Sequence, residues 1–267
     1  MIGAMLGRVW AIALNTFREA ARIRVLYGIL VLVVGVNLLA AVAGKMSMGE
    51  QARVARDWGL AGISLFGSLT AIFLGVFLLY SEVQRRTIYA IVSKPIGRSE
   101  FVVGKYLGMV LVLTVLVGLF AAAMAGLLAL QGVAVTGSVG KAIALAWCEV
   151  VTVAAIAVFF SAFSSPFLSG IFALALFAIG RVTPDLRAAV ETSQDAWIRG
   201  VARAALAVVP DLHLYSVSGR TVDGAAVSVH GDFVSWAYVG TAAAHGLLWS
   251  AALLVIACVI FRRREFV

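Results

Sequence analysis

Long apolar runs, separated by short polar and charged segments, dominate the pattern of this sequence. A helix of roughly 20 residues, at about 1.5 Å of rise per residue, crosses the hydrocarbon core of a bilayer. The pattern predicts six such spans, at residues 25–44, 60–80, 106–130, 142–160, 166–181 and 239–261. The predicted fold class is therefore an all-α integral membrane protein, a single transmembrane domain covering residues 1–267.

Two further segments have an amphipathic pattern. In the first, Leu6 to Arg22, the apolar residues Trp10 and Phe17 recur at helical spacing, whereas Arg18 and Arg22 belong to the polar surface. This spacing predicts a helix at the headgroup boundary. In the outer loop 182–238, apolar residues spaced four and seven apart predict a surface helix that ends at Pro210, followed by a small hairpin or an irregular cap.

The composition agrees with a membrane protein, because 63% of the residues are hydrophobic and only 13% are charged. Both cysteines, Cys148 and Cys258, fall inside predicted spans, so we expect packing residues and no disulfide framework. The first apolar run follows several arginines and lacks a small-residue cleavage pattern after it. We expect it to be retained as a span and not removed as a secretory signal.

Basic residues next to the spans predict the orientation of the chain. Twelve of the 21 lysines and arginines lie on one side, in the N-terminal segment, the connector 85–105 and the C-terminal residues 262–264. Since basic residues next to spans favour the cytoplasm, both termini are predicted to be cytoplasmic. This asymmetry and anionic headgroups account for the net charge of +8, so we do not expect nucleic-acid binding.

The connector "RRTIYAIVSKPIGRSEFVVGK", residues 85–105, concentrates basic residues in a chain that otherwise avoids charge. Its pattern predicts a short helix over 81–93 that the Lys94-Pro95 step ends. Ser99 is then expected to cap a helix running through Lys105 into the third span. Two interpretations are open: a tether to lipid headgroups, or a rigid contact with another protein.

The same residues carry a resemblance to a known family. The pattern of Glu82, Arg85-Arg86-Thr87, Ser93 to Arg98 and Gly104-Lys105, together with the six-span layout, resembles the type-2 ABC exporter permeases. It is most similar to the stand-alone permease components associated with multicopper-enzyme maturation. The resemblance extends over the whole chain, including the closing basic segment after the last span.

The resemblance implies a permease that dimerises, with itself or with a related permease, and sits on cytoplasmic ABC ATPase subunits. In that family the loop after the second span forms a coupling helix against the ATPase. The residues that this implies for the ATPase contact and the exit of the loop are Glu82, Arg85, Arg86, Thr87, Pro95, Arg98 and Lys105. For any one of them the alternative is that the side chain only solvates the loop.

No motif for nucleotide chemistry is visible in the sequence. The chain lacks a G-x-x-x-x-G-K-[ST] pattern, so we expect it to bind no cofactor, with ATP and Mg²⁺ on the partner ATPase. Four serines around Pro166 lack a nearby basic partner and are read as a turn between the fourth and fifth spans. The chain is therefore not expected to be an enzyme.

Two ionisable residues lie inside predicted spans. Glu149 falls in the middle of the fourth span, where a carboxylate must be paired, protonated or hydrated. It is interpreted either as a polar lining of the transport path or as a hydrogen bond that locks two helices. His245, near the outer end of the last span, is equally ambiguous. His213 and His230 in the outer loop give weak support for a metal, and we expect no metal site.

Six spans form a thin wall for a pathway, whereas a two-fold dimer would enclose one at its interface. The leading hypothesis is a transmembrane permease subunit of an ATP-driven exporter in the cytoplasmic (inner) membrane. Two alternatives remain: an ATP-independent membrane scaffold or assembly factor, and an ion-coupled carrier that uses Glu149. The sequence does not determine the transported substrate.

Overall fold

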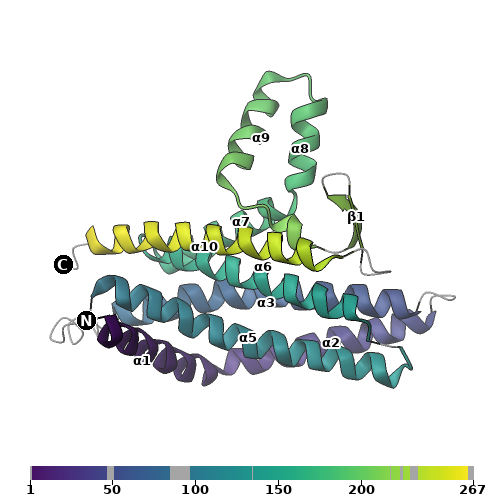
Figure 1. The fold of residues 1–267 in the computed structure, drawn as a ribbon, viewed down its shortest axis with the longest axis horizontal. Coiled ribbons are helices and arrows are strands. Elements are labelled where there is room, and N and C mark those ends of the chain that lie inside the picture. Colours follow the sequence, from purple (N-terminus) through teal and green to yellow (C-terminus); the bar gives the residue numbers. More distant parts are fainter. Residues whose placement is uncertain are drawn as a thin grey trace.

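The structure is a computed structural model that describes residues 2–46, 51–84, 97–133, 135–216, 218–222, 225–228 and 234–263. Long helices lie side by side in one elongated bundle (Figure 1). These helices are α1 (Ile2–Ala21), α2 (Arg24–Met46), α3 (Gln51–Gln84), α5 (Arg98–Leu130), α6 (Gly137–Ser161), α7 (Pro166–Arg181) and α10 (Trp236–Arg263). The predicted all-α membrane fold is confirmed.

Helix α6 occupies the centre of the bundle. It packs against α3, α5, α7 and α10, and its residues from Glu149 to Val158 are buried without interruption. A helix that is apolar and buried on every side belongs in the interior of a bundle. Among the described residues, α6 is therefore the element around which the other spans are arranged.

The helices agree with the predicted spans, but two of them are parts of bent pairs. Four helices are by themselves long and apolar enough to cross a membrane: α3, α5, α6 and α10. The number rises to six if each of two bent pairs is one span, α1 with α2 at 64° and α7 with the following helix at 61°. The described part of the chain thus contains four to six candidate spans, with the predicted six as the upper limit.

One end of the bundle collects both termini (Figure 1). There the side chain of Arg98, at the start of α5, donates to the carbonyl of Arg262 near the end of α10 at 3.1 Å. The rings of Phe101 and Phe261 stack one turn further in, with centroids 6.2 Å apart. The segment between α3 and α5, which contains most of the connector, therefore joins two helices at the end where the chain begins and finishes.

The outer loop folds into several short elements. Helices α8 (Thr183–Thr192) and α9 (Ala196–Val208) form a hairpin that projects away from the bundle in Figure 1. A 3-10 turn, η1 (Leu212–Tyr215), and the antiparallel strands β1 (Ser218–Val222) and β2 (Ala225–Ser228) follow. The prediction of a small hairpin after Pro210 is confirmed.

The prediction of one continuous surface helix in this loop is wrong. The chain leaves the helical conformation at Ser193, which has extended backbone angles, and Asp195 occupies the cap position of α9. Short polar side chains such as Ser and Asp compete with the helical hydrogen bonds and favour caps and turns. The apolar spacing correctly predicted helix on each side of the break. The polar residues 193–195 between α8 and α9 interrupt the helix.

Candidate functional site

Much of the predicted ATPase contact lies outside the described residues. This applies to Arg85, Arg86, Thr87 and Pro95, so their predicted roles stay predictions. Glu82 belongs to the last turn of α3, and the predicted short helix over 81–93 overlaps the described chain only in that turn. The structure describes the exit of the connector, from Gly97 onward.

The predicted helix cap at this exit is wrong by two residues. Helix α5 already begins at Arg98, and Gly97 is its cap residue. The backbone N–H of Gly97 donates to Oε2 of Glu100 at 3.4 Å, as in the carboxylate half of a capping box. Ser99 is thus inside the first turn, because the side chain of Glu100, three residues after Gly97, satisfies the helix end at Gly97.

Two ion pairs join the exit of the connector to α1. The guanidinium of Arg8 donates through Nε and one terminal nitrogen to the two oxygens of Glu100, both at 2.8 Å. One turn further along α5, the ammonium of Lys105 contacts Oε2 of Glu19 at 3.1 Å. A two-pronged guanidinium–carboxylate pair fixes orientation as well as distance. The two pairs therefore hold α1 at a set angle along the start of α5.

Glycines let the two helices approach closely between these ion pairs. A Cβ placed on Gly104 would lie 2.8 Å from the Ile12 side chain, and a Cβ on Gly108 would lie 2.5 Å from the carbonyl oxygen of Ala13. Real side-chain carbons do not come that near to other atoms, so only glycine fits without a shift. We call the two ion pairs and these two glycines the α1–α5 clamp.

The clamp changes the interpretation of the N-terminal amphipathic segment. The segment is helical as predicted, but Val9 and Ala13 are buried against the bundle and not against lipid. Trp10 is 57% exposed, and Arg18 and Arg22 are exposed as well. The buried stripe of α1 thus faces α5, whereas the tryptophan and the two arginines remain available to the membrane surface.

A second charged group lies inside the bundle. Glu149 on α6 is 1% exposed, and the hydroxyl of Ser64 on α3 donates to its Oε2. Nε of Arg181, the last residue of α7, lies 3.1 Å from its Oε1, and the guanidinium also donates to Ser64. These three side chains, which we call the buried triad, connect three helices.

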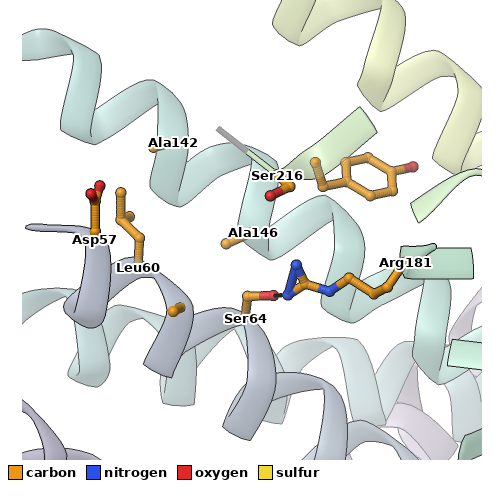
Figure 2. Close-up of a pocket in the computed structure, with 9 residues that line it drawn as sticks. Asp57, Leu60, Ser64, Ala142, Ala146, Arg181 and Ser216 are labelled. Carbon is orange, nitrogen blue, oxygen red and sulfur yellow. Dashed lines mark hydrogen bonds between the residues drawn. The ribbon is translucent and has the colours of Figure 1, made fainter. Parts of the chain in front are cut away.

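A small cavity of about 60 Å³ opens beside the triad. Figure 2 shows the side chain of Arg181 extending to Ser64, with Asp57 and Leu60 on α3 further along the same space. Ser216, just after η1, completes the polar lining. The side chain of Arg181 is 29% exposed, whereas that of Glu149 is only 1% exposed.

Tyr215 closes the cavity on the side of the outer loop. Its hydroxyl donates to the carbonyl of Ala242 on α10 at 3.3 Å, and a Cβ on Gly246 would lie 2.5 Å from the hydroxyl oxygen. Burial raises the pKa of Tyr215 to about 12. The hydroxyl serves as a hydrogen-bond donor that ties η1 to α10.

His245 is engaged within its own helix. The indole N–H of Trp249 donates to Nε2 of His245 at 3.1 Å. His213 is buried in η1, and His230 lies outside the described residues. No group of three or more His, Cys, Asp or Glu side chains suited to a metal occurs in the described chain.

Sequence analysis missed Arg181 and Ser64. The sequence pattern did not single out Arg181, although helical rise matches it to Glu149. From the turn between α6 and α7, Glu149 lies about 18 Å back along one helix and Arg181 about 22 Å along the next. Two antiparallel helices joined by a short turn bring such positions to similar depth. Ser64 gave no comparable signal.

Comparison with known protein families gives a match over nearly the whole chain. The model of the family described as ABC-2 family transporter protein matches residues 10–266, which is nearly the whole chain. No curated protein matches the sequence. The matched range includes all of the buried triad and all residues of the α1–α5 clamp except Arg8.

Proposed function

This chain belongs to the ABC-2 family of transporter proteins, and on that premise we propose that it is the permease subunit of an ATP-driven exporter. The family makes it the membrane component of an ABC transporter and not the catalytic part. We further propose that two permease chains form a dimer with separate ATPase subunits in the cytoplasmic (inner) membrane. Both termini and the connector then face the cytoplasm.

The α1–α5 clamp is the observation that carries the mechanism. The ATPase would contact the connector between α3 and α5, through Glu82, Arg85, Arg86 and Thr87. Because two ion pairs and two glycine contacts fix α1 to the start of α5, a push on the connector would move both helices together. Helix α5 packs along α6, which would carry the movement into the buried centre.

The buried triad would hold the resting state of the pathway. Glu149, Ser64 and Arg181 tie three helices together, next to a cavity that lies toward the outer loop. A pathway along this side of α6 would open only if α7 moved relative to α3. The arrangement favours a carboxylate that links helices over one that binds a transported ion. Ser64 donates to one oxygen of Glu149, and Arg181 forms an ion pair with the other.

The test is to purify the tagged chain from its native membrane in mild detergent and to identify its companions by mass spectrometry. We expect a stoichiometric P-loop ATPase whose activity the permease stimulates. Reversing the charge of Glu82 or Arg86 should abolish this stimulation, because a charge pair across an interface sets register as well as affinity. The matched control is Arg203→Glu on the exposed surface of α9, which should leave stimulation unchanged.

One result would contradict the proposed permease function, and another would contradict the assignment of the coupling contact. The first is a purified permease without any ATPase, under conditions that preserve a control transporter. The second is full stimulation after charge reversal at both Glu82 and Arg86. The first result would favour the scaffold or the ion-coupled carrier, and the second would only remove the assignment of the coupling contact.

A further inference from the structure

An apolar groove opens at the elbow between α1 and α2. The two helices meet at 64°, and the bend leaves an open space of about 160 Å³ against the side of α5. Phe17 and Ala21 from the end of α1, Tyr27 from the first turn of α2, and Val115 and Leu119 from α5 contribute to its walls. Figure 1 shows α1, α2 and α5 meeting along this edge of the bundle.

The groove is apolar and faces outward. Val115 is 52% exposed and Leu119 is 48% exposed, although both lie in the middle of a helix that spans the membrane. An apolar cavity of about 150 Å³ is large enough for benzene, so this groove is large enough for a run of several methylene groups. In the middle of a membrane span, the apolar groups that surround a protein are the acyl chains of lipids.

Three arginines lie close in sequence to residues that line the groove. Arg18 precedes Ala21 by three residues on α1, and Arg24 precedes Tyr27 by three residues on α2, so each shares a helix face with a groove residue. Arg22 lies in the bend between them. All three side chains are exposed, and no hydrogen bond or ion pair within the described chain engages their guanidinium groups.

The nearest acidic side chain does not neutralise these arginines. Glu19 lies between Arg18 and Arg22 in the sequence, but its carboxylate is occupied by Lys105 of the clamp. The elbow is therefore a basic rim above an apolar groove. That combination fits an amphiphile with an anionic headgroup, because each arginine near an anionic membrane surface adds favourable energy.

The hydroxyl of Tyr27 gives the groove a defined wall. It donates to the carbonyl of Ala21 at 3.2 Å and so satisfies a backbone group that the end of α1 leaves without a helical partner. This hydrogen bond links α1 to α2 across the bend. The groove is thus held open by a side chain and does not depend on the lipid for its shape.

We propose that the α1–α2 elbow is a binding site for one anionic phospholipid of the leaflet next to the termini. An acyl chain lies between Tyr27 and Val115, and the phosphate lies among Arg18, Arg22 and Arg24. The bound lipid would fill the space that the bend leaves open and would stabilise α1 in its clamped position. This site is separate from the ATPase contact and from the buried triad.

The test uses the full chain, stripped of lipid in detergent and titrated with phosphatidylglycerol or phosphatidylcholine under native mass spectrometry. We expect one phosphatidylglycerol per chain to bind more tightly than phosphatidylcholine. Replacing the three arginines together (R18Q, R22Q and R24Q) should weaken phosphatidylglycerol binding about tenfold or more and remove the preference. The control R199Q with R203Q on α9, where Arg203 is exposed and Arg199 is half-buried, should keep it.

A second variant tests the groove independently of the charges. Val115→Trp should fill the space from α5 and weaken the binding of both lipids, while the exposed position leaves the fold intact by size-exclusion chromatography. Equal binding of the two lipids to the unmodified chain would overturn the proposal. So would an unchanged preference in the arginine variant.

A second copy of the chain is the competing occupant of this groove. Single cysteines at Val115 or Leu119, introduced after removal of Cys148 and Cys258, would then form a disulfide-linked dimer in lipid vesicles. If the same yield of disulfide-linked dimer formed with and without phosphatidylglycerol, the proposed lipid site would be wrong. Because none of these measurements involves an ATPase, their failure would leave the proposed permease function intact.

Discussion

The α1–α5 clamp and the buried triad both use charge to join helices, but they do so in different surroundings. In the clamp, Arg8 is 38% exposed and its ion pair with Glu100 is supported by a second pair and by two glycine contacts. In the triad, Glu149 is 1% exposed and depends on Arg181 and Ser64 alone. The clamp is redundant and partly hydrated, whereas the triad has one charge partner in a dry interior.

This difference predicts how each group fails. Water screens a partly exposed ion pair, so the loss of one member costs little. A buried carboxylate that loses its partner has no water to replace it, and its burial then opposes folding. We therefore expect the triad to control whether the bundle is stable, and the clamp to control how precisely α1 follows α5.

The largest effect is expected from Arg181→Met. This change leaves Glu149 buried without a positive partner, at a cost of about 3–5 kcal/mol in the free energy of unfolding. The measurement is the thermal unfolding of the purified chain in detergent, followed by tryptophan fluorescence. Glu149→Gln should cost clearly less, because the arginine that it leaves behind is 29% exposed and lines the cavity.

The double variant separates a missing charge partner from a packing defect. Combining Glu149→Gln with Arg181→Met should restore part of the stability that Arg181→Met loses, since no buried charge is then left without a partner. If the double variant were as unstable as the sum of the single ones, the ion pair would not be the reason for the loss. Arg187→Met is the control and should shift stability little, because the Arg187 side chain is 48% exposed and its partner Asp211 also accepts hydrogen bonds from Thr183 and the backbone of His213.

The next largest effect is expected at the glycines of the clamp. Gly108→Leu places side-chain atoms against the carbonyl of Ala13 and the Thr16 side chain, and overpacking of this kind costs about 1–3 kcal/mol. We expect a lower unfolding temperature and a faster proteolytic release of α1. The control is Gly118→Leu on the same helix, where nothing lies within 4 Å of the added carbon. An equal decrease in unfolding temperature in both variants would show that Gly108 is needed for α5 itself and not for the contact between α5 and α1.

The smallest effect on stability is expected from the exchange of charges between Arg8 and Glu100. Arg8→Glu alone places two carboxylates together and should lower the unfolding temperature slightly, less than either change above. Adding Glu100→Arg should restore most of the loss, because the pair is formed again in reverse. If the unfolding temperature did not recover in the double variant, the ion pair between Arg8 and Glu100 would not contribute to stability. If the clamp transmits movement, Arg8→Glu should also reduce the stimulation of a bound ATPase. This reduction should be large even though the unfolding temperature falls only slightly.

The sequence was most informative where one property repeats along a helix. The apolar runs predicted the existence of α2, α3, α5, α6, α7 and α10, because crossing a bilayer requires length and hydrophobicity that few other structures need. Helices α3 and α5 begin nine and eight residues before the predicted spans 60–80 and 106–130. The turn around Pro166 was also predicted, since proline fits the first turn of a helix and lacks only a hydrogen bond that is missing there anyway. The family resemblance, carried by the connector and the layout, agrees with the family match.

The sequence was least informative where a polar residue depends on a partner far along the chain. Glu149 was recognised as costly, but Arg181 was not identified as its partner, because pairing depends on how α6 and α7 lie against each other. Trp10 and Val9 have the same apolar character in the sequence, and only the packing of α1 on α5 exposes the first and buries the second.

By itself, the sequence determined that this protein crosses a membrane as a set of helices and which segments those helices include, since hydrophobic length is a local property. The tertiary structure decided which charges meet. It brought Arg8 to Glu100 and Glu149 to Arg181, across separations of 92 and 32 residues. The physical reason is that a charge in or near a membrane must be paired or hydrated, and which of the two applies depends on the helix that packs beside it.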